Sequence, residues 1–104
     1  MSWEIVLFNS TQSIKSIEDL DENKFILTSF CAVLEKSFEM AKSQGRDFSI
    51  DFYKDDVPVY NKIVSVNDEN GLFELIDIAR KNNWQLFDLG LDEVIDLENP
   101  KKDG

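Results

Sequence analysis

Two stretches of the chain repeat apolar residues at the spacing of a helix. In the first, apolar side chains recur at steps of three and four residues, at Leu27, Phe30, Cys31, Leu34, Phe38 and Ala41. Thr28 is a suitable N-cap and Gly45 a suitable left-handed residue after the last turn, so we expect this helix to begin near Thr28. The second stripe consists of Leu72, Leu75, Ile76 and Ala79. An acidic turn at 67–71 can cap that helix, and Asn82-Asn83 can end it.

Four other stretches have the composition and spacing of strands. Residues 3–8 are apolar on both sides, which indicates a strand in the middle of a sheet. Residues 47–53 alternate between apolar and polar positions, and a second strand is expected at 61–66, so the two form a predicted hairpin. Residues 84–89 are extended as well, and residues 93–97 can add a short fifth strand.

The predicted elements follow the order β-α-β-β-α-β, which is the order of the ferredoxin-like architecture. The expected fold class is therefore α+β, with an antiparallel sheet and two helices on one face. The alternative is an irregular α+β sheet in which residues 84–97 form a hairpin of their own. A length of 104 residues favours one domain spanning 1–104, with a frayed tail at about 99–104.

The charge of the chain narrows the choice of partner. Its 21 acidic and 11 basic residues give a net charge of −10, which weighs against direct binding to nucleic acids or to anionic membranes. A basic protein partner remains compatible with this charge, although acidity also serves solubility alone. The N-terminus lacks the basic start and the long apolar run of a signal peptide, and no stretch is long enough to span a membrane, so we expect a cytoplasmic location.

The residue types limit the chemistry. The chain has no histidine, which excludes catalytic triads with an imidazole base, and its one cysteine cannot form a zinc cluster or an internal disulfide. Cys31 lies on the first helical stripe, where we expect a core residue. The segment Val66 to Asp77 matches a calcium loop only in part, because Val66 has no side-chain oxygen at the first ligand position, and a helix cap explains Asp68 better.

Paired acids are the remaining catalytic candidates. They occur at Asp55/Asp56, at Asp92/Glu93 and at Asp19/Asp21/Glu22, all in predicted turns where a solvated surface is the simpler interpretation. A small hydrolase that uses carboxylates is therefore the least favoured functional hypothesis for this chain. We expect no enzymatic activity, no metal and no cofactor.

One segment combines acidity with apolar residues. Between Trp84 and Asn99 there is no lysine or arginine, yet there are five acids among aromatic and aliphatic residues. Such a surface could bind a basic protein, with charge speeding the encounter and apolar side chains supplying the binding energy. The candidate partner-binding residues are Trp84, Asp88, Asp92, Glu93, Asp96 and Glu98. Strand alternation alone, with apolar residues in the core and acids in water, is the open alternative.

The same segment carries a resemblance. Trp84-Gln85-Leu86-Phe87-Asp88, Gly90-Leu91 and the run from Ile95 to Pro100 resemble the C-terminal signature of a family of small, acidic, largely uncharacterised bacterial proteins. The stretches Asn70 to Leu75 and Trp3 to Asn9 are similar to that family too. Proteins of this kind resemble immunity proteins, which bind and neutralise a cognate bacterial toxin. The resemblance implies no role for any single residue.

Two functional hypotheses follow from these observations. The leading hypothesis is a non-enzymatic protein-binding module, an immunity-type inhibitor of a basic toxin domain. The alternative is a self-associating regulatory domain, because an open sheet face or edge can pair with a second copy to form a homodimer.

Overall fold

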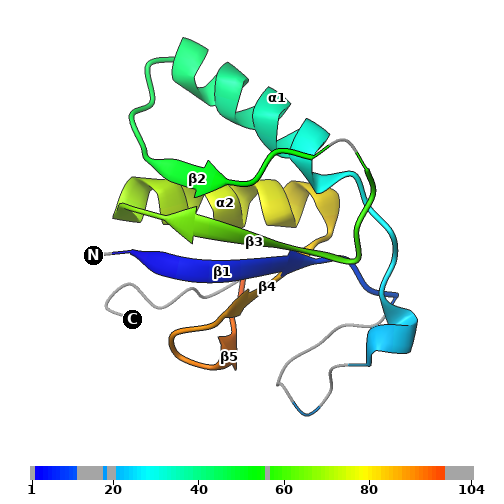
Figure 1. Cartoon of the computed structure of the whole chain (residues 1–104). Coiled ribbons are helices and arrows are strands. Elements are labelled where there is room, and N and C mark those ends of the chain that lie inside the picture. Colours follow the sequence, from blue (N-terminus) through cyan, green and yellow to red (C-terminus); the bar gives the residue numbers. More distant parts are fainter. Residues whose placement is uncertain (1, 12–17, 19–20, 56, 98–104) are drawn as a thin grey trace.

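The chain folds into two layers, a sheet and a pair of helices (Figure 1). The computed structural model describes residues 2–11, 18, 21–55 and 57–97. In chain order the elements are β1 (Trp3–Phe8), the short 3-10 helix η2 (Glu22–Lys24), α1 (Phe30–Ser43), β2 (Ile50–Phe52), β3 (Asn61–Val66), α2 (Glu69–Asn82), β4 (Gln85–Asp88) and β5 (Glu93–Val94). The strands lie in the order β2-β3-β1-β4-β5, with every neighbouring pair antiparallel.

The strand order confirms the predicted fold class. β1 lies in the middle of the sheet between β3 and β4, and β2-β3-β1-β4 is the order that two interlocked βαβ units produce. Both helices lie on one face of the sheet (Figure 1). The fifth strand forms, but it consists of two residues and extends the same sheet at the outer side of β4.

The main core lies between the sheet and the helices. Ile5 and Leu7 of β1 are fully buried there, beneath Leu34 of α1 and Leu75 of α2. Burial of this apolar surface stabilises the fold at roughly 25 cal/mol per Å² removed from water. Phe38 joins α1 to the residues around β2, since its ring lies 5.3 Å from that of Phe48 and 6.0 Å from that of Phe52.

The start of α1 differs from the prediction. The helix begins at Phe30 with Ser29 in the cap position, and no side-chain hydrogen bond caps it. Thr28 instead pairs with Val59 in an isolated bridge, in which the two backbone N–H groups donate to the opposite carbonyls at 2.9 and 3.0 Å. The predicted stripe is therefore wrong at Leu27, whose side chain is exposed because the chain has not yet entered the helix.

The helix end and the first hairpin follow the prediction in outline. Gly45 has a φ of +86° just after the helix, as the sequence indicates for a left-handed residue. The hairpin forms too, but its first strand spans only Ile50–Phe52 of the predicted 47–53.

The start of α2 depends on Asp68 and Gly71. The Asp68 carboxylate accepts a hydrogen bond from the backbone N–H of Gly71 at 2.7 Å, so the helix begins at Glu69, earlier than its apolar stripe. A Cβ atom at Gly71 would lie 3.1 Å from the carbonyl oxygen of Ser49, which explains why a glycine occupies this first turn. At the other end, Asn83 adopts the left-handed conformation with a φ of 58°, as predicted.

The last residues of the chain, from 98 onward, lie outside the described residues. The predicted frayed tail and Glu98 therefore stay predictions. Neither helix of the described chain has the length and the apolar composition that a membrane span requires.

The cap at Asp68 gives the first testable prediction. We expect Asp68→Ala to lower the free energy of unfolding by about 1 kcal/mol, because the N–H of Gly71 loses its acceptor. Asp68→Asn keeps an acceptor oxygen and should cost much less. Urea unfolding followed by tryptophan fluorescence measures both values. An equal loss in the two variants would show that the charge of Asp68 matters and the cap does not.

Candidate protein-binding surface

The structure buries two of the six candidate partner-binding residues. Trp84 is only 3% exposed, and its ring meets the ring of Phe30 edge-on at a centroid distance of 4.8 Å. Asp88 is buried too, and its Oδ1 accepts hydrogen bonds from the backbone N–H groups of Gly90 and Leu91 at 2.9 and 3.2 Å. Both side chains therefore serve the fold, and neither is available to a partner.

Three of the other candidates lie on the surface. Asp92, Glu93 and Asp96 are exposed on or just after the turn between β4 and β5. Leu89 and Leu91 of the same turn are exposed apolar residues. The predicted combination of acids and apolar side chains is thus present on this turn, without Trp84 as its anchor.

The residues of a second exposed surface were not identified from the sequence, which indicated only that a sheet face or edge could be open. It is the face of the sheet opposite the helices, and we call it the open sheet face, defined by Glu4, Val6, Asp51, Ile63, Ser65, Phe87 and Val94. Its residues alternate along the strands with the buried residues of the main core. None of the described strand positions on this face is a lysine or an arginine.

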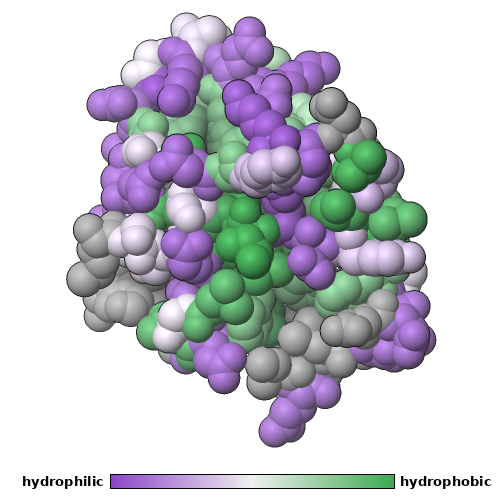
Figure 2. Space-filling view, in the orientation of Figure 1, coloured by the Kyte–Doolittle hydropathy of each residue, from purple (hydrophilic) through white to green (hydrophobic). Residues whose placement is uncertain are grey.

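The middle of the open sheet face is an apolar row across four strands. Val6 of β1 is paired with Ile63 of β3 on one side and with Phe87 of β4 on the other, and Phe87 is paired with Val94 of β5. Phe87 is buried in a small second core with Phe8, whereas Ile63 remains 54% exposed. Figure 2 shows hydrophobic surface gathered in the middle of this view, over β3 and β1.

A polar row lies beside the apolar row. Asp51 and Glu4 each pair with Ser65, one from either neighbouring strand. The Ser65 hydroxyl donates to the two carboxylate oxygens of Glu4 at 3.0 and 2.9 Å, and Asn67 Nδ2 donates to Asp51 Oδ2 at 2.9 Å. These donors are neutral, so they orient the carboxylates without cancelling their charge.

The third row is covered by the chain itself. Phe8 pairs with Asn61 and Gln85, and the ring of Phe25 stacks on the ring of Phe8 at 5.2 Å. Phe25 belongs to the segment that leads into α1, and this segment covers one end of the face. The accessible part of the face is therefore Ile63 with the partly buried Val6 and Val94, together with the row of Glu4 and Asp51.

Charge is distributed unevenly between the two layers. Residues 30–48 and 68–83, which form the helical layer, contain seven acids and five bases. Two ion pairs balance charge there, Arg46 with Glu74 at 3.2 Å and Lys81 with Asp77 at 2.9 Å. The rest of the described chain contains ten acids and only three bases. The excess of acids thus lies outside the helical layer, on the sheet, its turns and the segment that leads into α1.

One of those three bases is buried. Lys62 is 6% exposed on the helix side of β3, where its ammonium group donates to the Tyr53 carbonyl and to Asp55 Oδ2, the latter at 2.9 Å. The ammonium also lies 5.5 Å from the centre of the Tyr53 ring. Lys62 therefore holds the loop after β2 against the sheet. The alternation Lys62-Ile63-Val64 could have indicated this burial, because Lys62 shares the side of Val64.

Cys31 lies near this pair and is a core residue, as predicted. Burial raises the pKa of its thiol above the ordinary value, and the hydrogen bond that the thiol donates to Glu35 at 3.3 Å acts in the same direction. The backbone of Asp55 and the charge of Lys62 oppose the shift but do not reverse it. A raised pKa disfavours the thiolate that nucleophilic catalysis requires.

The described acids of the pairs considered as catalytic candidates lie in separate parts of the chain. Asp55 is engaged by Lys62, Asp92 and Glu93 lie on the exposed turn between β4 and β5, and Asp19 and Asp56 lie outside the described residues. In the part of the chain that the structure describes, no three cysteine or acidic residues are grouped as a metal site would need. Asp68 caps α2, so the calcium-like segment serves as a helix start.

The buried lysine gives a prediction about stability. Lys62→Met keeps most of the aliphatic stem but leaves the Tyr53 carbonyl and the Asp55 carboxylate without their charged donor. We expect the free energy of unfolding to fall by about 1–3 kcal/mol, the cost of unsatisfied polar groups. Lys54→Met, an exposed lysine in the same loop, is the matched control and should change it by less than about 0.5 kcal/mol. Equal effects of the two substitutions would contradict the assigned role of Lys62.

The thiol gives a prediction about pH. Because the folded pKa of Cys31 is raised, its contribution to stability is complete below the ordinary value of 9.0 and is lost as the pH rises through the folded pKa. Alkylation of the native protein by iodoacetamide should therefore be slower than in urea, with its midpoint at a higher pH. The Cys31→Ala variant should lose less stability above pH 9 than the unmodified chain does. Fast native alkylation at neutral pH would contradict the burial of the thiol.

The chain was compared with protein-family models, with curated proteins and with solved structures, and none of the three comparisons found a match. The surface of the chain itself offers two features that bear on function: an open sheet face on which Ile63 is exposed, and two acids, Glu4 and Asp51, on that same face.

Proposed function

We propose that this chain is a non-enzymatic protein-binding module for a basic protein, and that it acts as an immunity-type inhibitor of a basic toxin domain. The observation that carries the proposal is that exposed acids and exposed large apolar side chains occur together on the sheet and its turns. The exposed apolar side chains are Ile63, Leu89 and Leu91, and exposed acids beside them are Glu4, Asp51 and Asp92. Outside the helical layer, the described chain has ten acids and three bases.

The two properties support binding in different ways. A surface of one charge sign attracts an oppositely charged partner and raises the rate of encounter, especially at low ionic strength. The affinity of a protein interface comes mainly from a few apolar or aromatic side chains that become fully desolvated at its centre. An exposed apolar row beside acids, as at Ile63 and Glu4, supplies both properties on one face.

Self-association through the same face is the second candidate function. The exposed Ile63 and the partly buried Val6 beside it favour it, since two such surfaces could bury each other. A symmetric dimer places the same surface on both subunits, however, and would bring Glu4 and Asp51 near the same acids of the other copy. Because like charges across an interface cost several kcal/mol, a basic partner fits this face better than a second copy does.

Co-expression with the product of a neighbouring reading frame that encodes a basic protein tests the proposal. We expect the complex to be retained at about 0.1 M salt and to weaken toward 1 M, where the Debye length falls from about 10 to 3 Å. For an immunity-type inhibitor, co-expression should also restore the growth of cells that the partner inhibits. A chain that retains no basic protein at low salt, or that sediments as a stable homodimer, would contradict the proposal.

A further inference from the structure

We infer that the partner docks on the open sheet face, and that the docked element is an amphipathic segment with an apolar side and a basic side. Its apolar side chains would lie on Ile63 and Val6, and its lysine or arginine side chains beside Glu4 and Asp51. This inference rests on the proposed function, because it assigns the site and the chemistry of the same basic partner.

The apolar part of the argument starts from Ile63. Its side chain is 54% exposed although it sits in the six-residue strand β3, next to the central strand. A β-branched side chain has few rotamers, so little conformational entropy is lost when a partner covers it. Val6 on β1 and Val94 on β5 extend the row. Both pack against the buried Phe87, which restricts the movement of their side chains.

The charged part of the argument starts from Glu4 and Asp51. They lie on strands two positions apart, which places their backbones about 10 Å from each other on either side of Ser65. Ser65 and Asn67 orient the two carboxylates through neutral hydrogen bonds. Because the sites of negative charge are already ordered, a guanidinium or ammonium group can form charge-assisted hydrogen bonds at little further cost in ordering.

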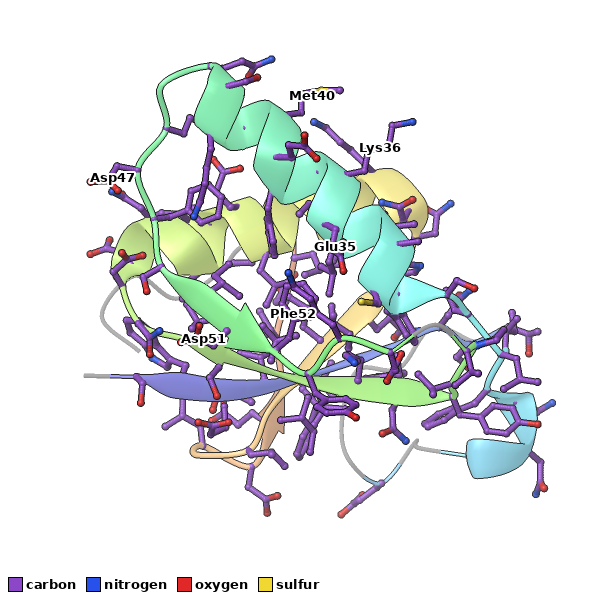
Figure 3. All side chains as sticks on the ribbon, turned by 45° about the horizontal axis from the view of Figure 1, so that its top comes forward. Glu35, Lys36, Met40, Asp47, Asp51 and Phe52 are labelled. Carbon is purple, nitrogen blue, oxygen red and sulfur yellow. The ribbon has the colours of Figure 1, made fainter. Side chains whose placement is uncertain are left out.

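The turn between β4 and β5 also exposes Leu89 and Leu91 beside Asp92, but it is a short turn and not a row of side chains across paired strands. Two further exposed apolar surfaces are not accompanied by acids alone. Around the bridge that joins Thr28 to Val59, four apolar side chains are exposed, at Ile26, Leu27, Val57 and Tyr60. Lys24 and Lys54 belong to the same two segments, so this end of the molecule does not have a single charge sign. On α1, Met40 points away from the sheet beside Lys36 (Figure 3), in the layer whose charge is nearly balanced.

Figure 3 also shows how β2 divides the two surfaces. Phe52 lies between β2 and α1, where it meets Phe38, whereas Asp51 lies on the side that belongs to the open sheet face. A substitution at Asp51 or at Ile63 therefore changes this face without removing a side chain from the main core. That separation allows the docking site to be tested on the intact, folded chain.

The probe for the test is a synthetic peptide of leucine and lysine that has one apolar and one basic face. A peptide in which glutamate replaces lysine is its control. Titration of the full-length ¹⁵N-labelled chain should move the amide signals of Val6, Ile63 and Ser65 most, in a saturable way. The glutamate peptide should leave them in place.

Two pairs of variants refine the test. Ile63→Thr keeps a β-branched residue in the strand and should weaken the binding of the lysine peptide about tenfold. Met40→Thr is its matched control, since Met40 is 55% exposed on α1, and should leave the affinity unchanged. Glu4→Gln with Asp51→Asn should lower both the affinity and its dependence on salt, whereas Glu39→Gln with Asp47→Asn, which removes the same charge elsewhere, should lower both much less.

Three outcomes would overturn the inference. The first is a lysine peptide that moves signals around Leu89 to Asp96, or around the bridge of Thr28 and Val59, and ignores Ile63→Thr. The second is the absence of saturable binding. The third is a concentration-dependent shift of Val6 and Ile63 without any peptide, which would assign the face to a second copy of the chain. The proposed function is tested independently of the docking site, because retention of the basic partner in co-expression does not depend on where that partner docks.

Discussion

A sheet of five strands has two faces, and the helices α1 and α2 of the described chain cover one of them. β1 lies in the middle of the sheet and carries apolar side chains on both sides, Ile5 and Leu7 toward the helices and Val6 and Phe8 away from them. The chain covers the second side in part, by stacking Phe25 on Phe8. The segment that contains Phe25 does not reach the rest of this face, and Ile63 remains exposed to water there. The exposed apolar row is thus a direct consequence of the topology and of the central position of β1.

The helix-covered face contains a different compromise, the buried ammonium of Lys62. A buried charge is tolerated only when it is paired and hydrogen-bonded, and Lys62 satisfies this through the carbonyl of Tyr53 and the carboxylate of Asp55. The loop after β2 is thereby tied to β3 near the start of α1. The backbone of Asp55 and the charge of Lys62 also act on the thiol of Cys31. The cluster of cysteine, lysine and acids in this place therefore anchors a loop.

Local rules in the sequence predicted the elements well and their tertiary partners less well. The helical spacing of Leu72 to Ala79 and the cap at Asp68 are properties of neighbouring residues, so they could be inferred directly. Thr28 has equally good cap chemistry, but its backbone is taken by Val59, a contact between residues far apart in sequence. Trp84 and Asp88 failed as surface candidates for a related reason. They share the side of Leu86, which faces the helices, and that orientation depends on the register of β4 against β1.

The open sheet face could have been anticipated from one conflict within the sequence. Residues 3–8 are apolar on both sides, whereas two helices can cover a single face, so a second apolar surface must either be covered by loops or remain exposed. Acidity alone would then be explained by solubility, since negative charge keeps an exposed apolar patch from aggregating. Solubility, however, does not require that acids paired with bases lie on one layer and acids held by neutral donors on the other. The helical layer pairs Arg46 and Lys81 with acids, while Glu4 and Asp51 are held by a hydroxyl and an amide. Neutral donors beside an apolar row leave the charge of these carboxylates available, which is the arrangement that favours a basic partner.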